Sequence, residues 1–136
     1  MSDQIETGGC FCGEVRYEVP SQLRNLCLCH CESCRKAAGA PFVAWGTIDR
    51  KDLKLYSGEL AIYKSSAGVE RGACNKCGTS LTYWSQSRGN EIDITLASLD
   101  QAEKFRPCIQ IFVEDKLNWI ETNPDLPKYD TVPGKE

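Results

Sequence analysis

The stretch "CLCHCESCRKAAG", residues 27–39, places four cysteines within eight positions and follows them directly with two cations. The 136-residue chain holds nine cysteines, and two further pairs lie in "GGCFCG" (8–13) and "CNKCG" (74–78). C-x-C and C-x-x-C spacings allow neighbouring thiolates to converge on a single metal ion. We therefore expect these cysteines to organise the fold by binding metal.

A disulfide framework is the weaker interpretation. The N-terminus, "MSDQIETGGC", lacks the apolar core of a secretory signal, and no apolar run is long enough to span a bilayer. We therefore expect a cytoplasmic protein whose thiols stay reduced, and the odd number of cysteines agrees with this. The net charge of −3 has the wrong sign for gripping a phosphate backbone. We expect no nucleic-acid partner and no membrane partner.

Most of the chain alternates in the way that short β-strands do. The composition, 41% hydrophobic and 26% charged, is that of an ordinary globular protein. Segments rich in Val, Ile, Tyr, Phe and Thr predict strands at 14–19, 42–48, 53–58, 59–64, 80–84, 91–96 and 109–114. One short helix is expected at 32–39, ending at Gly39, and a single turn at 98–105. The tail, 123–136, is expected to run extended over the surface, so we predict a mostly β single domain.

Two of the cysteine pairs have the spacing of a closed zinc site. Cys10 and Cys12 point to the same face of an extended segment, and Cys74 and Cys77 lie in a knuckle-like turn. Together they supply the four sulfurs of a structural zinc. Such an ion would clamp the N-terminal segment to the middle of the chain.

The cysteines of residues 27–39 form a third group, which differs because three of them can converge on one ion. Cys29 and Cys31 share a face, and a turn can bring Cys34 beside them, which gives the three protein ligands of an open, catalytic zinc site. His30 should point the other way and is expected to pack or to hydrogen-bond there. Cys27 could instead close the site as a fourth ligand, which would make it structural.

The remaining cysteine and the large aromatic residues are expected to be structural. Cys108 follows an apolar strand-like pattern, so we expect a buried thiol. The aromatic residues at strand-like positions are expected in the core or in a groove wall. They are Trp45, Tyr63, Tyr83, Trp84 and Trp119.

The order GGCFCG, CHCESCRKAAG, CNKCGTSL resembles the glutathione-dependent formaldehyde-activating enzyme family, whose members adopt a zinc-containing β-tent fold. The resemblance covers the chain from Gly8 to about Tyr129, including 63–81 and 107–130, and it implies one domain of this type over residues 1–136 with a core at about 8–130. It implies a structural zinc on Cys10, Cys12, Cys74 and Cys77. It also implies a catalytic zinc on Cys29, Cys31 and Cys34. This chain has Gln110 where many relatives have a histidine.

The chemistry that the resemblance implies is carbon–sulfur bond formation and cleavage. The substrates would be a small-molecule thiol, glutathione, and an aldehyde, formaldehyde, and their adduct is S-hydroxymethylglutathione. A three-thiolate zinc suits the binding of an added thiol as a thiolate. Because glutathione carries two carboxylates, nearby cations are candidate substrate contacts: Arg35, Lys36, Lys64 and Arg71. The alternative is a non-catalytic zinc-binding β module that binds a protein partner.

Overall fold

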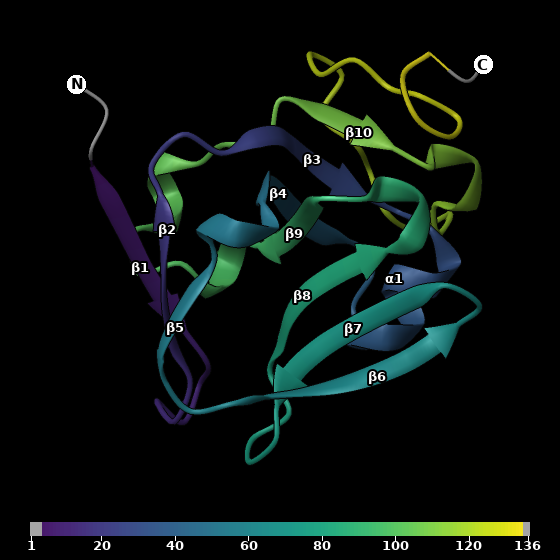
Figure 1. Cartoon of the computed structure of the whole chain (residues 1–136). Helices are drawn as coiled ribbons and strands as arrows, with labels where there is room; N and C mark the ends of the chain where they lie inside the picture. Colours follow the sequence, from purple (N-terminus) through teal and green to yellow (C-terminus); the bar gives the residue numbers. More distant parts are fainter. Residues whose placement is uncertain (1–3, 135–136) are drawn as a thin grey trace.

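Two β-sheets face each other across a hydrophobic core in the computed structural model, which describes residues 4–134 (Figure 1). The smaller sheet has three strands in the order β1-β2-β5, and the larger has seven in the order β10-β3-β4-β9-β8-β7-β6. The strands are β1 (Ile5–Gly9), β2 (Arg16–Pro20), β3 (Arg24–Cys29), β4 (Val43–Asp49), β5 (Lys54–Ser57), β6 (Leu60–Ser66), β7 (Val69–Cys74), β8 (Ser80–Ser85), β9 (Glu91–Thr95) and β10 (Ile109–Ile111).

The larger sheet is antiparallel except at one end, where β10 runs parallel to β3. It curves from β10 to β6 in Figure 1, with the three-stranded sheet beside it. Among residues 4–134, four single turns of 3-10 helix lie between strands, Arg50–Asp52, Gln86–Arg88, Leu96–Ser98 and Ala102–Lys104, and a fifth, Val113–Asp115, follows the last strand. None of the helices in the described part of the chain has the length and apolar character needed to span a bilayer.

The main core fills the space between the sheets because apolar residues alternate along the strands that border it. Val15, Tyr17 and Val19 lie on one side and are at most 2% exposed. Ile48 and Ile94 from the larger sheet pack with them in the same cluster. Burial alternates with period two along β2, whereas β4 and β9 are buried over consecutive residues because both faces of the larger sheet are covered there.

The opposite face of the larger sheet carries a second buried cluster, and this face positions the candidate site. Cys27 and Cys29 on β3 pair with Trp45 and Val43 on β4. All four side chains are buried and pack together with Cys34. The thiols at 27 and 29 are therefore interior groups of this face of the sheet.

The one α-helix among the described residues, α1 (Glu32–Ala38), packs against this second face and follows directly from β3. Cys31 caps its N-terminus, because its Sγ accepts a hydrogen bond from the backbone N–H of Cys34 at 3.3 Å. Gly39 ends the helix with φ 63°, a conformation that favours glycine, and its N–H bonds to the Arg35 carbonyl at 2.7 Å. The predicted single short helix is confirmed.

The mostly β prediction is also confirmed, although the strand assignment was incomplete. All seven predicted strands exist, with shifted ends, and the turn expected at 98–105 appears as Ala102–Lys104. Strands β1, β3 and β7 were not predicted. In β7, Gly72 interrupts the pattern because a Cβ there would lie 2.4 Å from the Thr82 Oγ1 atom. In β3, the cysteines were interpreted only as metal ligands, although they are strand residues as well.

The tail is more firmly attached than an extended surface segment would be. Gln110 N donates to the Pro127 carbonyl at 2.9 Å, and Tyr129 N donates back to the Gln110 carbonyl at 3.0 Å. Phe112 N then donates to the Thr131 carbonyl at 2.9 Å. The tail therefore extends the larger sheet beyond β10; its last two residues, 135–136, lie outside the described residues.

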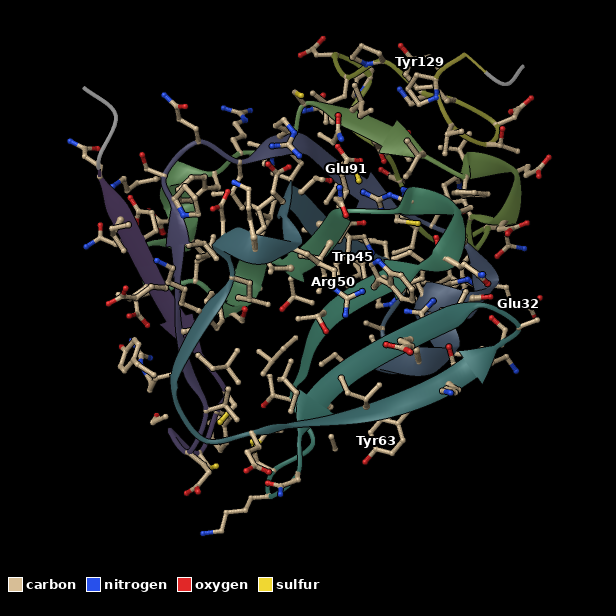
Figure 2. The ribbon with its side chains drawn as sticks, viewed as in Figure 1. Glu32, Trp45, Arg50, Tyr63, Glu91 and Tyr129 are labelled. Carbon is tan, nitrogen blue, oxygen red and sulfur yellow. The ribbon has the colours of Figure 1, made fainter. Side chains whose placement is uncertain are left out.

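Two structural expectations were wrong. Cys108 is exposed rather than buried, because it precedes β10 and the tail pairs only with the residues from Gln110 onward. Trp119 is 67% exposed, because it lies in an irregular segment outside both sheets. Trp45, in contrast, lies in the interior, whereas Tyr63 is found at the β6 edge (Figure 2).

Candidate metal and thiol site

The four cysteines of the first group lie together, although two come from the loop after β1 and two from the turn after β7. The Sγ atoms of Cys10, Cys12, Cys74 and Cys77 all lie within 4.8 Å of one another. Cys12 Sγ is 3.6 Å from Cys10 Sγ and 3.8 Å from Cys74 Sγ. Tetrahedral zinc with bonds of 2.3 Å to sulfur requires sulfur–sulfur separations of roughly 3.8 Å. The arrangement therefore fits a closed site of four thiolates.

Backbone and hydroxyl donors around this group favour the ionised sulfurs that a metal requires. Val15 N donates to Cys10 Sγ at 3.2 Å, and Cys77 N donates to Cys74 Sγ at 3.4 Å. The Thr79 hydroxyl lies 3.1 Å from Cys77 Sγ and is the main reason that the pKa of the Cys77 thiol is lowered to about 5. These contacts support metal binding at neutral pH.

The second group contains three thiols at the junction of β3 and α1. The Sγ atoms of Cys29, Cys31 and Cys34 lie within 4.8 Å of one another. Contacts with the Cys29 and Cys31 thiols lower the pKa of the Cys34 thiol, and the Trp45 indole and the Arg71 guanidinium lower it further. Contacts with Cys31 and Cys34, together with burial, raise the pKa of Cys29. The donor set fits a zinc ion with three protein ligands.

Cys27 is not a member of this group, although it precedes Cys29 by two positions. Its side chain packs beside Trp45, and burial raises the pKa of the Cys27 thiol to about 12. Its Sγ atom is therefore not gathered with those of Cys29, Cys31 and Cys34. This geometry favours the open arrangement of three ligands over closure by Cys27.

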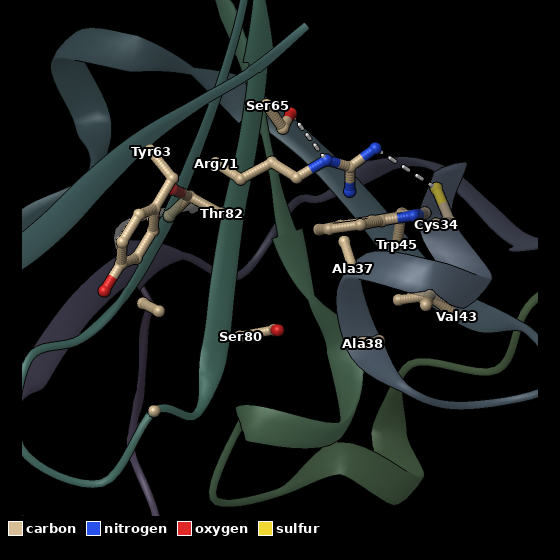
Figure 3. A pocket seen from close by; sticks show the side chains of 13 residues that line it. Cys34, Ala37, Ala38, Val43, Trp45, Tyr63, Ser65, Arg71, Ser80 and Thr82 are labelled. Carbon is tan, nitrogen blue, oxygen red and sulfur yellow. Dashed lines mark hydrogen bonds between the residues drawn. The ribbon is translucent and has the colours of Figure 1, made fainter. Parts of the chain in front are cut away.

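A cavity of about 360 Å³, which we call the thiol cavity, lies between α1 and strands β6 to β8. Cys34 forms part of its wall beside Trp45, Tyr63 and Arg71, as Figure 3 shows. A neighbouring hollow of about 410 Å³ shares Ala37, Ser65 and Arg71 with it. We call this second space the cation hollow, because Lys36 also lines it.

Arg71 is the candidate cation that reaches the thiols. Its Nη2 atom lies 3.9 Å from Cys34 Sγ, and its Nε donates to Ser65 Oγ at 3.2 Å. The guanidinium carbon lies 4.8 Å from the centre of the Tyr83 ring, which holds the group in place. The guanidinium therefore points toward the cavity rather than into solvent (Figure 3).

The other three candidate cations have different surroundings. Lys36 lines the cation hollow. Arg35 turns back on the thiol loop, where its Nε donates to the His30 carbonyl at 3.4 Å. Lys64 is exposed and lines neither space, because it points to the opposite face of β6 from Tyr63 and Ser65. The structure thus brings Lys36 and Arg71 together beside the thiols and leaves Lys64 apart.

Comparison with known proteins identifies the family. The model of the family described as "Glutathione-dependent formaldehyde-activating enzyme" matches residues 5–115. The chain belongs to this family. The mostly β, tent-like class and the observed cysteine order agree with that membership.

Relatives with provisional or general names share much of the chain. An uncharacterized lyase of Schizosaccharomyces pombe is 27% identical over 80% of this chain and 79% of its own. A Halomonas elongata protein, provisionally named a glutathione-dependent formaldehyde-activating enzyme, is 28% identical over 84% of this chain and 78% of its own. A Rhodobacter sphaeroides protein of known crystal structure has a TM-score of 0.61 at 20% identity, covering 90% of this chain and 98% of that one. This last likeness concerns the fold alone.

In this member of the formaldehyde-activating family, Gln110 forms a buried pair with His30. His30 Nε2 lies 2.8 Å from Gln110 Oε1, and both residues are 1% exposed. His30 also packs on Phe42 with ring centres 5.4 Å apart, on the side away from the thiol group. Its backbone N–H donates to the Ile111 carbonyl at 3.0 Å. The residue between Cys29 and Cys31 is therefore fixed to β10, as expected for a packed histidine.

Several residues of the site were not found from the sequence. Ser65 and the hydroxyls of Ser33 and Ser66 line the cation hollow with the two cations. Alternation of Tyr63 and Ser65 along β6 was a usable signal for one shared face. Arg71 could not be placed opposite Tyr63 without knowledge of β7, the strand that carries it.

Proposed function

We propose that the chain is a zinc-dependent carbon–sulfur lyase, active as a single domain, that forms or cleaves the adduct of glutathione or a related thiol with a small aldehyde. Membership of the formaldehyde-activating family supports this reaction class. The lyase name of the S. pombe relative and the provisional name of the H. elongata relative support it as well. The cofactors of the proposal are two zinc ions.

The observation that carries the proposal is the opening of the three-thiol group into the thiol cavity. Cys34 belongs to the group and also to the cavity wall. Zinc held by three thiolates supplies a coordination position that lowers the pKa of an added thiol. The volume of this cavity, about 360 Å³, is that of a small-molecule site.

The cation hollow is suited to a carboxylate of the thiol substrate. Arg71 and Lys36 provide two positive charges against the one negative charge of Glu32, and Ser65 and Ser66 provide hydroxyl donors beside them. Because Arg71 lines both spaces, a thiol at Cys34 and a carboxylate at Lys36 can belong to one molecule. Glutathione, with a carboxylate at each end, matches this arrangement.

The reaction itself is an addition that needs no oxidant. The sulfur attacks the carbonyl carbon, a carbon–sulfur bond forms, and the proton lost by the thiol ends on the former carbonyl oxygen. Ser80 and Thr82 place hydroxyl-bearing side chains in the cavity wall, where they can donate to that oxygen. Trp45 and Tyr83 pack with ring centres 6.0 Å apart and restrict water on the thiol side.

The test measures, by exchange NMR, the formation of the adduct from glutathione and formaldehyde. The zinc-replete protein should accelerate exchange between free formaldehyde and S-hydroxymethylglutathione. Arg71→Gln should raise the KM for glutathione about tenfold or more, because it removes a charge-assisted contact. Lys64→Gln, which removes one cation from the neighbouring strand but from the opposite face, should leave the KM unchanged. Absence of acceleration by the zinc-replete protein would refute the proposal.

A further inference from the structure

A third hollow continues the thiol cavity away from the cations. It has a volume of about 600 Å³, and its wall shares Ala38, Val43 and Ser80 with the thiol cavity. We call it the distal groove. It lies between the end of α1 and the loop after β1, so the thiol cavity is bordered by a cationic space on one side and by this groove on the other.

The distal groove has a largely apolar wall. Ala40, Phe42, Ala44, Ala97 and Leu99 line it, together with Phe11, which is 94% exposed. Among the described residues, neither lysine nor arginine contributes to this wall. A polar ligand would therefore find few complementary charges there.

Most of the polar side chains in the groove wall already have partners within the protein, and the Ser80 hydroxyl is shared with the thiol cavity. Thr95 Oγ1 donates to the Ser80 carbonyl at 3.0 Å, and Ser98 Oγ donates to the Thr95 carbonyl at 2.8 Å. The one carboxylate, Asp100, accepts hydrogen bonds from Arg16 and from the Thr7 hydroxyl. Satisfied polar groups offer little to a new polar ligand, whereas apolar surface gains by being covered.

We propose that the distal groove binds the carbon chain of the aldehyde, so that the substrate class is the thiol adduct of an apolar alkyl aldehyde of several carbons. This inference rests on the proposed lyase function, since the thiol cavity must hold the sulfur. The single carbon of formaldehyde would leave the groove unused. With the aldehyde carbon near Cys34, a longer alkyl chain attached to it passes between Ala38 and Ser80 and covers Phe11.

Binding of stable thioethers tests the groove without requiring turnover. S-hexylglutathione and S-methylglutathione contain the carbon–sulfur bond of the adduct and differ only in chain length. Calorimetry on the zinc-replete protein should show the hexyl conjugate binding at least tenfold more tightly than the methyl conjugate, because each buried methylene adds to the affinity.

A matched pair of variants locates the chain. Ala97→Asp places a charge in the groove wall at an exposed position, and it should reduce the hexyl preference to less than threefold. Ala67→Asp makes the same change at an exposed turn position that lines neither the groove nor the thiol cavity, and it should keep the full preference.

The outcomes separate the two proposals. If the wild-type protein binds both conjugates equally, the groove does not hold the chain, and the inference is wrong while the thiol site stands. If the hexyl preference survives in Ala97→Asp, the chain lies elsewhere and the inference is also wrong. If neither conjugate binds, the inference is wrong as well, whereas the proposed function is decided by the exchange test, because a thioether has no thiol proton and cannot bind zinc as a thiolate.

Discussion

Zinc should reverse which of two variants, Cys77→Ser or Cys34→Ser, is the less stable. Each variant removes one thiol from one of the two cysteine groups. Cys77 is exposed, whereas Cys34 is 5% exposed. By burial alone, serine should cost more at Cys34, by about 1 kcal/mol for a hydroxyl without a good partner. At exposed Cys77 the same change should cost little.

Zinc binding changes the stability difference between the two variants in the opposite direction. The first group joins residues 62 positions apart, such as Cys12 and Cys74, whereas Cys29 and Cys34 are only five positions apart. Because loop-closure entropy scales with the logarithm of loop length, the longer clamp contributes about 2 kcal/mol more stability. With zinc, Cys77→Ser should therefore be less stable than Cys34→Ser by about 1 kcal/mol, and without zinc the order should reverse.

Thermal melts measure both orders. For a chain of this length, about 1 kcal/mol corresponds to a difference of about 4 °C in Tm. The melts are run on zinc-replete protein and after removal of metal with a chelator under reducing conditions, with the zinc content of each variant counted. If Cys34→Ser is the less stable variant in the presence of zinc as well, the reasoning about a long-range clamp is refuted.

Three further predictions concern metal, protons and pH. Purified under reducing, chelator-free conditions, the chain should hold close to two zinc ions, counted by atomic emission; full activity with one zinc or less would contradict the two-site reading. Glutathione should bind with release of about one proton near neutral pH, measured by calorimetry in buffers of different ionisation enthalpy; binding without proton release would argue against thiolate capture. The free energy of unfolding should fall between pH 9 and pH 12, because burial raises the pKa of Cys27 to about 12 from 9.0, so the unfolded chain loses this proton first. Cys27→Ala should flatten that decline in denaturant titrations, and an unchanged slope would place the effect elsewhere, for example at Tyr17, whose pKa burial also raises.

Local chemistry made the metal groups predictable from sequence. Thiols two or three residues apart can be placed relative to one another by strand alternation and turn geometry alone, so Cys10 with Cys12, and Cys31 with Cys34, needed no knowledge of the fold. The joining of Cys12 to Cys74 was expected from the four ligands of a closed zinc site, and the family resemblance implied this grouping.

The sequence alone could not show which side chains of neighbouring strands share a face of the sheet. Arg71 and Lys64 are both cations in polar surroundings, and only the pairing of Tyr63 with Arg71 shows which one shares the cavity face. That pairing includes a register shift between Tyr63 and Ser66, which no local pattern reveals. The distal groove was equally hidden, because its wall combines the helix end, the loop after β1 and the turn after β9.

The attachment of the tail to β10 bears on how this chain can be cut for expression. The family match stops at residue 115, yet Pro127 and Tyr129 make backbone hydrogen bonds with Gln110. A recombinant fragment that ended at the family boundary would uncover the edge of a parallel strand that sits directly beside the thiol-bearing β3. Uncovered edges invite pairing between molecules. Affinity tags therefore belong at the N-terminal end, ahead of the first strand, which lies in the other sheet.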